Sequence, residues 1–143
     1  MVKIILFVCK HNRFRSRVAE AFFNKINKNK KYVGKSAGVI NGGYPLNKNQ
    51  IDVAREFGIT IDGKPQGISL YLLKKQNILV IVADDVPMGL FNTKNYRKEG
   101  YIKKIISWKI NDTINGKENS KEEIRKIIKI IENKVKGLVE ELR

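Results

Sequence analysis

The chain has 143 residues, of which 42% are hydrophobic and 30% are charged, a balance typical of one globular domain with a single core. Its 29 basic and 14 acidic residues give a formal net charge of +15, which favours anionic substrates or partners. One cysteine and one histidine exclude an internal disulfide and leave no cysteine or histidine cluster for a metal, and no segment approaches the ~20 apolar residues of a membrane span. We therefore expect a single domain over 1–143.

The distribution of the lysines gives little support to a nucleic-acid partner. They are spread over most segments, and no recognition motif for RNA or DNA accompanies the small clusters at 28–31 and 103–104. A solvated lysine-rich surface that steers anionic substrates at low salt explains the charge better. The N-terminus lacks a signal-peptide cleavage site, so we expect a first strand there, a protein of the reducing cytoplasm and no membrane partner.

In the first half of the chain, strand patterns alternate with helix patterns. Residues 2–8 are an apolar run that predicts a buried parallel strand. Apolar residues at helical spacing predict a helix from Ser16, its expected N-cap, to about Asn27. Residues 32–39 predict a second strand, and the pattern over 47–57 predicts a second helix.

The second half repeats this alternation. It predicts a short helix over 68–75, an entirely apolar strand over 78–83, a helical turn over 88–91 and a fourth strand over 102–107. The capping box from Ser120 to Glu123 opens the longest helix. Alternating strands and helices predict a three-layer α/β/α sandwich around a four-stranded parallel sheet, which binds its ligand beyond the carboxyl ends of the strands.

The loop between the first strand and the first helix carries the most chemical information. It contains the only cysteine, Cys9, at the end of the strand, and Arg15 and Ser16 follow at the start of the helix. Backbone N–H groups at such a helix start have no helical partner and attract anions, and the same field favours an ionised thiol. A lone cysteine on a buried strand is usually a small hydrophobic residue, but this spacing favours a nucleophile.

This loop permits phosphate-ester chemistry. Cys9 would attack the phosphorus of a bound monoester and form a phosphocysteine. The planar fork of Arg15 would bind two phosphoryl oxygens, and the N–H groups from Lys10 onward would stabilise the equatorial charge. The Ser16 hydroxyl can reach back to the sulfur and stabilise the thiolate. The predicted phosphate-binding residues are Lys10, His11, Asn12, Arg13, Phe14, Arg15 and Ser16.

Three aspartates compete for the role of the general acid that protonates the leaving oxygen. Asp84 and Asp85 directly follow the apolar strand, and Asp112 lies in a loop before the last helix. Each of them is also a plausible turn residue or solvated charge. The residues alone leave this choice open.

The segment from Val8 to Ser16, together with Ala19-Glu20, resembles the low-molecular-weight protein tyrosine phosphatase family and the thioredoxin-coupled arsenate reductases that share its fold. Ser36-Ala37-Gly38, Pro45 and the segment Glu56-Phe57-Gly58-Ile59 also fit, so the resemblance covers essentially the whole chain. It implies the fold of that family and the hydrolysis of phosphate monoesters, with a phosphotyrosine protein as substrate.

The resemblance also implies roles for individual residues. Cys9 is implied as nucleophile, Arg15 as phosphate clamp and Ser16 as thiolate stabiliser, while Asn12 holds the shape of the loop. Asp112 is implied as the general acid, because the segment from Trp108 matches the one that leads into the family's Asp-Pro. Thr113 replaces that proline, which could loosen the acid loop, and Phe14 replaces a smaller residue, which could narrow the cleft.

The presence of a single cysteine helps to choose between the two activities that the resemblance implies, phosphate-ester hydrolysis and arsenate reduction. Arsenate reduction by an internal cascade needs further cysteines after the third strand, and residues 83–100 contain none. A reductase would therefore need an external thiol or redoxin, whereas hydrolysis needs only Cys9 and neither a metal nor an organic cofactor. We predict a phosphatase, with the reductase as the alternative. A non-catalytic module that binds phosphate or nucleic acid is less favoured, because it gives no reason for the thiol.

Overall fold

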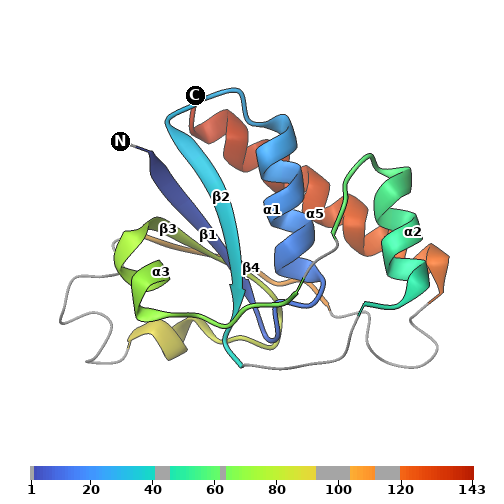
Figure 1. Cartoon of the computed structure of the whole chain (residues 1–143), viewed down its shortest axis with the longest axis horizontal. Coiled ribbons are helices and arrows are strands. Elements are labelled where there is room, and N and C mark those ends of the chain that lie inside the picture. The colour runs from blue at the N-terminus through green and yellow to red at the C-terminus, as the bar shows by residue number, and fades with distance from the viewer. Residues whose placement is uncertain (1, 41–45, 62–63, 93–103, 112–119) are drawn as a thin grey trace.

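Four parallel strands form one sheet in the described part of the chain. The computed structural model describes residues 2–40, 46–61, 64–92, 104–111 and 120–143. The sheet has the order β2-β1-β3-β4, so the first strand lies in its interior (Figure 1). The predicted four-stranded parallel sheet is thus confirmed. The strands are β1 (Lys3–Cys9), β2 (Tyr32–Gly38), β3 (Gln76–Val82) and β4 (Ile105–Trp108).

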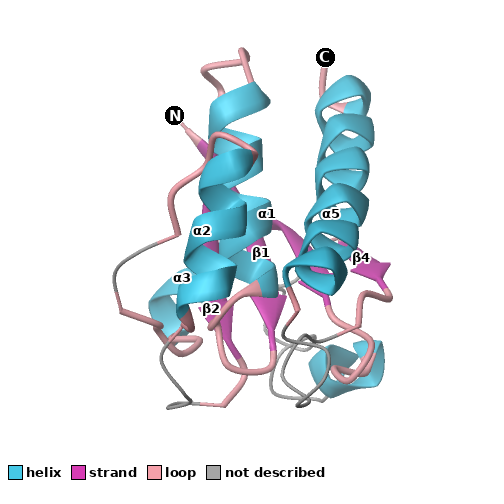
Figure 2. Ribbon diagram, turned by 90° about the vertical axis from the view of Figure 1, so that its right-hand side faces the viewer, coloured by secondary structure: helices cyan, strands magenta, loops and turns pink. Residues whose placement is uncertain are grey.

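Helices cover both faces of the sheet, as predicted. Helices α1 and α5 lie beside each other on one face, and α2 packs against α5 (Figure 2). The short helix α3 and the 3-10 helix η1 cover the other face. No helix in the described part of the chain has the length and apolarity needed to cross a membrane. The helices are α1 (Arg15–Ile26), α2 (Lys48–Glu56), α3 (Leu70–Lys75), η1 (Met88–Asn92) and α5 (Lys121–Glu141).

Strand β1 separates two hydrophobic cores. Ile5 and Phe7 point toward α1 and α5, while Leu6 and Val8 point toward α3 and η1, and all four side chains are fully buried. Alternate residues of a strand face opposite sides of its sheet, so burial on both sides requires the continuous apolar run seen in the sequence. This packing fixes the end of β1, and with it Cys9.

The start of α1 differs from its prediction. The helix begins at Arg15, and its N-cap is Phe14, which makes no capping hydrogen bond through its side chain. The expectation that Ser16 caps this helix is wrong, because its hydroxyl faces the sulfur of Cys9. By contrast, Ser120 caps α5 as predicted and accepts a hydrogen bond from the Glu123 N–H.

The carboxyl ends of the strands lie along one edge of the sheet, at the bottom of Figure 1. Cys9 at the end of β1 is in register with Gly38 at the end of β2. Val82 at the end of β3 is in register with Trp108 at the end of β4. This is the edge at which parallel α/β sheets bind ligands, so the chain positions its predicted nucleophile where the fold class leads us to expect a site.

Candidate active site

The sulfur of Cys9 lies against the first turn of α1. Cys9 is only 3% exposed, and its Sγ is 3.0 Å from the Ser16 Oγ. The Asn12 Nδ2 donates a hydrogen bond of 2.8 Å to that same oxygen. Since the Ser16 oxygen already accepts from Asn12, its own proton is available to the sulfur.

A backbone N–H fixes the orientation of the Asn12 side chain. The Gln66 N–H donates to the Asn12 Oδ1 at 2.9 Å, and a backbone N–H can only donate. The amide oxygen of Asn12 must therefore face Gln66, and its NH2 group must face Ser16. Hydrogen bonds thus connect Gln66 through Asn12 to the Ser16 hydroxyl, which can donate its proton to a Cys9 thiolate.

The loop after Cys9 is held in shape by the end of β2. The Val39 N–H donates to the Cys9 carbonyl at 3.0 Å, and the Ile40 N–H donates to the Lys10 carbonyl at 2.9 Å. Gly38 lies so close to the loop that an added Cβ would be 2.4 Å from the carbonyl carbon of His11. Only glycine allows this approach, and it lets the loop turn back over the end of the sheet.

Asn12 adopts the backbone conformation that the loop requires. Its φ of 55° lies in the left-handed region, which asparagine tolerates better than most residues. The same residue anchors the loop through both ends of its side chain. Asn12 therefore holds the shape of the loop, as the resemblance implied.

Arg15 is almost completely buried, at 2% exposure, and its guanidinium is surrounded by acceptors. Its Nη1 donates to the Ile110 carbonyl at 2.9 Å, and its Nη2 donates to the Asp85 Oδ1 at 3.0 Å. A longer contact of 3.4 Å joins Nη1 to the Asp84 Oδ1. The segments that follow β3 and β4 thus orient Arg15, the arginine predicted to clamp the phosphate.

The aspartates that follow β3 both contact the phosphate clamp. Asp84 and Asp85, two of the three candidates for the general acid, are partners of Arg15. The third candidate, Asp112, and its neighbour Thr113 lie outside the described residues, as does Pro45. The Ile110 carbonyl accepts hydrogen bonds from the Asp84 N–H at 3.0 Å and from the Arg15 Nη1. Ile110 precedes Asp112 by two residues in the chain.

The other loop residues divide between the surface and the interior. Lys10 and His11 are partly exposed, whereas Arg13 is 8% exposed. Phe14 is 2% exposed and packs in the core with residues of α1. Its bulk therefore occupies the core, and the expectation that it narrows the cleft is wrong.

Gln66 is a site residue that the sequence argument missed. It anchors Asn12 through its backbone, and its Nε2 donates to the Ser36 carbonyl at 2.7 Å. The Ser36 hydroxyl in turn donates to the Glu20 Oε1 at 2.6 Å. Nothing in the segment around Gln66 marks it as part of a site, because its partners are distant in the sequence.

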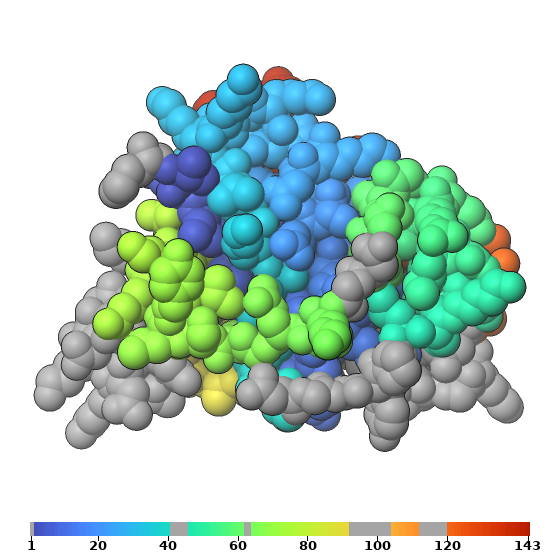
Figure 3. Space-filling model, in the orientation of Figure 1, coloured from blue at the N-terminus to red at the C-terminus, as the bar shows by residue number. Residues whose placement is uncertain are grey.

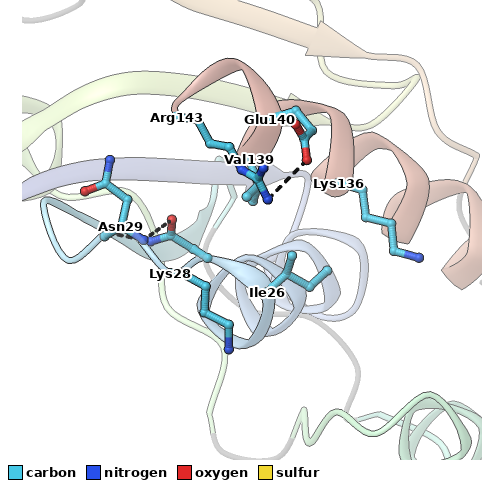
Figure 4. Close-up of a pocket in the computed structure, with 8 residues that line it drawn as sticks. Ile26, Lys28, Asn29, Lys136, Val139, Glu140 and Arg143 are labelled. Carbon is cyan, nitrogen blue, oxygen red and sulfur yellow. Dashed lines mark hydrogen bonds and ion pairs between the residues drawn. The ribbon is translucent and has the colours of Figure 1, made fainter.

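Two hollows in the surface differ in their relation to this site. One of about 480 Å³ lies next to the Arg15 partners, with Asp84, Met88 and Lys109 in its lining. Another of about 200 Å³ lies between Lys28 and Arg143, where Arg143 pairs with Glu140 at 3.4 Å (Figure 4). The second is at the opposite end of α1 from Cys9, so only the first adjoins the chemistry. No three acidic, histidine or cysteine side chains among the described residues gather into a metal site.

Solved structures of phosphatases and of a reductase share this fold. A low molecular weight protein tyrosine phosphatase from T. tengcongensis matches with a TM-score of 0.80 and 24% identity, over 97% of this chain and 99% of the other. An arsenate reductase from Archaeoglobus fulgidus matches with a TM-score of 0.69 and 26% identity, over 94% and 98%. An arginine phosphatase, YwlE, from Geobacillus stearothermophilus matches with a TM-score of 0.77 and 21% identity, over 98% and 92%.

No curated protein matches the chain in sequence. A family model does match it, over residues 4–143, and that range includes the loop from Cys9 to Ser16. The chain belongs to the low molecular weight phosphotyrosine protein phosphatase family.

Proposed function

We propose that this protein, as one domain over 1–143, hydrolyses phosphate monoesters of protein side chains, phosphotyrosine first among them, through a phosphocysteine. The observation that carries the proposal is the series of hydrogen bonds from Gln66 through Asn12 and Ser16 to the Cys9 sulfur. A hydroxyl that can donate to the sulfur stabilises a thiolate, and Arg15, which precedes Ser16 in the chain, supplies a fork for two phosphoryl oxygens. A site that only bound phosphate would have no use for the sulfur.

The first half of the reaction transfers the phosphoryl group to the enzyme. The Cys9 thiolate attacks phosphorus in line, the S–P bond forms, and the bond to the leaving oxygen breaks. Arg15 and the loop N–H groups balance the charge on the three equatorial oxygens. The leaving oxygen takes its proton from the general acid, for which we propose Asp112.

The second half returns the enzyme to its starting state. A water molecule attacks phosphorus, its proton passes to the same carboxylate, and the S–P bond breaks to release inorganic phosphate. The Ser16 hydroxyl, which faces the sulfur at 3.0 Å, stabilises the thiolate as it leaves. No other group needs to enter the site for the cycle to close.

The Arg15 contacts support Asp112 as the acid. Asp84 and Asp85 both accept hydrogen bonds from the Arg15 guanidinium and so orient the arginine, which leaves Asp112 as the candidate without this role. We expect Asp112→Asn to slow the hydrolysis of phosphotyrosine far more than that of p-nitrophenyl phosphate, whose leaving group needs little protonation. If Asp84→Asn or Asp85→Asn gives this pattern instead, the acid is one of those two.

The direct test of the function replaces the nucleophile. We expect wild-type protein to hydrolyse p-nitrophenyl phosphate and to be inhibited by vanadate, and Cys9→Ser to lose about 10⁴-fold or more in turnover. Ser16→Ala is the matched control, since it keeps the nucleophile and should lose far less. Equal turnover in wild type and Cys9→Ser would exclude the covalent mechanism.

The alternative is arsenate reduction with an external thiol or redoxin. In it the Cys9 thiolate bonds to arsenic with loss of hydroxide, and an external thiol then attacks the sulfur. That attack releases arsenite and leaves a mixed disulfide, which a second external thiol reduces. The 26% identity to the Archaeoglobus fulgidus reductase favours testing it, and the single cysteine weighs against it. Arsenate-dependent oxidation of an added thiol would establish this activity.

A further inference from the structure

The acidic residues of the described structure are concentrated on one side of the sheet. Segments 32–40 and 64–83, which include β2, α3 and β3, contain four lysines and not one aspartate or glutamate. Of the ten carboxylate residues in the described part of the chain, seven lie on α2 and α5, on the other face of the sheet.

The two sides also differ in how their charges are paired. Basic residues of α5 form ion pairs, among them Arg125 with Glu56 at 2.8 Å and Lys129 with Glu132 at 2.9 Å. Within the described residues, Lys35 and Lys64 have no carboxylate partner, and Lys75 contacts only an aromatic ring, that of Tyr71, at 5.9 Å. These ammonium groups keep their full charge for an external partner.

The unpaired lysines share one surface, which we call the basic face: Lys35 of β2, Lys64, and Leu70, Tyr71 and Lys75 of α3. Lys35 is exposed and in register with Leu6, which faces the side of the sheet that α3 covers. The segment between Lys64 and α3 is bonded to the end of β2, since the Ile68 N–H donates to the Gly38 carbonyl at 2.9 Å. In Figure 3 the cyan of β2 and the green of residues 64–75 adjoin on the side that faces the reader.

The basic face is continuous with the active site. Lys64 lies two residues before Gln66, whose N–H anchors Asn12 in the catalytic loop. Lys10, also without a carboxylate partner in the described structure, directly follows Cys9 and is partly exposed. When a phosphorylated side chain of a polypeptide enters the loop, the residues on either side of it would therefore lie near these lysines.

The composition of the face favours an acidic protein over a nucleic acid. Leu70 and Tyr71 are 56% and 65% exposed, and such apolar and aromatic side chains typify protein contacts. Segments 2–10, 28–40 and 64–83 contain no arginine, the residue that binds phosphates and guanine edges with two hydrogen bonds. Lysine supplies a point charge, which is sufficient for carboxylates on a flexible segment.

We infer that the basic face binds acidic segments of the protein substrate, so that the preferred substrates are phosphorylated side chains flanked by aspartate and glutamate. This inference rests on the proposed phosphatase function and names its substrate class. Electrostatic attraction of this kind raises the rate of association and weakens as salt is added. The preference should therefore appear in kcat/KM at low ionic strength.

The experiment compares two phosphotyrosine peptides that differ only in having glutamate or lysine flanks. The test variant combines Lys35→Glu, Lys64→Glu and Lys75→Glu. The control variant combines Lys126→Glu, Lys129→Glu and Lys136→Glu on α5, which changes the net charge equally on the opposite side of the sheet. Thermal unfolding of each variant shows whether it is folded, and p-nitrophenyl phosphate reports the chemistry itself.

We expect wild type to favour the glutamate-flanked peptide by about tenfold or more at low salt, and the test variant to lose that preference while the control variant keeps it. High salt should remove the preference from wild type. Equal kcat/KM for both peptides in wild type, or the same loss in both variants, would overturn the inference. Inhibition of wild type but not of the test variant by a single-stranded oligonucleotide, without a peptide preference, would assign the face to nucleic acid. A wild type that hydrolyses no p-nitrophenyl phosphate would refute the proposed function instead.

Discussion

At the scale of single residues, the hydrogen-bond partners of the Arg15 guanidinium determine its orientation in the site. A buried arginine needs acceptors, and those of Arg15 include the Ile110 carbonyl and the exposed carboxylates of Asp84 and Asp85. The carboxylates orient the fork, but their charge also repels an incoming phosphate. Because both are well exposed, at 42% and 37%, solvent screens that repulsion, and the orienting contact is the larger effect.

This balance predicts a difference between two substitutions of Asp85. Asp85→Ala removes the acceptor of Nη2, and we expect kcat/KM for p-nitrophenyl phosphate to fall about tenfold. Asp85→Asn keeps an acceptor oxygen and removes the charge, so it should retain most of the activity and bind inorganic phosphate at least as tightly. Steady-state kinetics with phosphate as inhibitor measure both effects. An asparagine variant as damaged as the alanine variant would show that the charge, rather than the orientation, matters.

At the scale of elements, α2 and α5 are joined on the surface by Glu56 and Arg125. Their side chains form two hydrogen bonds, of 2.8 and 3.0 Å. The hydrogen bond from Arg125 lowers the pKa of Glu56 below 4.5, and the same bond raises the pKa of Arg125. A carboxyl with a lowered pKa in the folded state stabilises the fold above its ordinary pKa, and that stabilisation is lost as the pH falls through the folded value.

We therefore expect Glu56→Gln to lower the melting temperature slightly at pH 7 and not at all once the pH is well below 4.5, where the wild-type carboxyl is also protonated. Thermal unfolding followed by circular dichroism across this range measures the difference. Glu141→Gln is the control, because it removes the same charge from α5 at a position without an ion pair to any described residue. An effect of Glu56→Gln that is constant with pH would contradict the assignment.

The elements also show what the sequence could predict. Parallel strands and the amphipathic α5 follow from local patterns, since the apolar run and the capping serine are visible in short windows. The prediction that Ser16 caps α1 is wrong, because the Ser16 hydroxyl contacts the Cys9 sulfur, which a local pattern does not reveal. Strand β3 begins at the polar Gln76, two residues earlier than the apolar pattern, because pairing with Ile4 extends it.

At the scale of the whole molecule, the contacts that complete the site are those that no local pattern contains. Cys9 and Ser16 are seven residues apart, so the spacing of the loop predicts their meeting. Gln66 is 54 residues from Asn12, and Ile110 is 95 residues from Arg15. The order of the strands brings these segments to one edge of the sheet, and the sequence alone gave no reason to pair them.

These distant segments all contribute to the surroundings of the Cys9 sulfur, and the central claim is that this sulfur is a nucleophile. Because Cys9 is the only cysteine, the rate of carboxymethylation by iodoacetate reports on it alone. In the native protein at pH 7 the rate should exceed that of the same cysteine in the unfolded chain, inorganic phosphate should slow it, and Ser16→Ala should lower it. A rate no higher in the native protein than in the unfolded chain, or one that phosphate does not slow, would contradict the account.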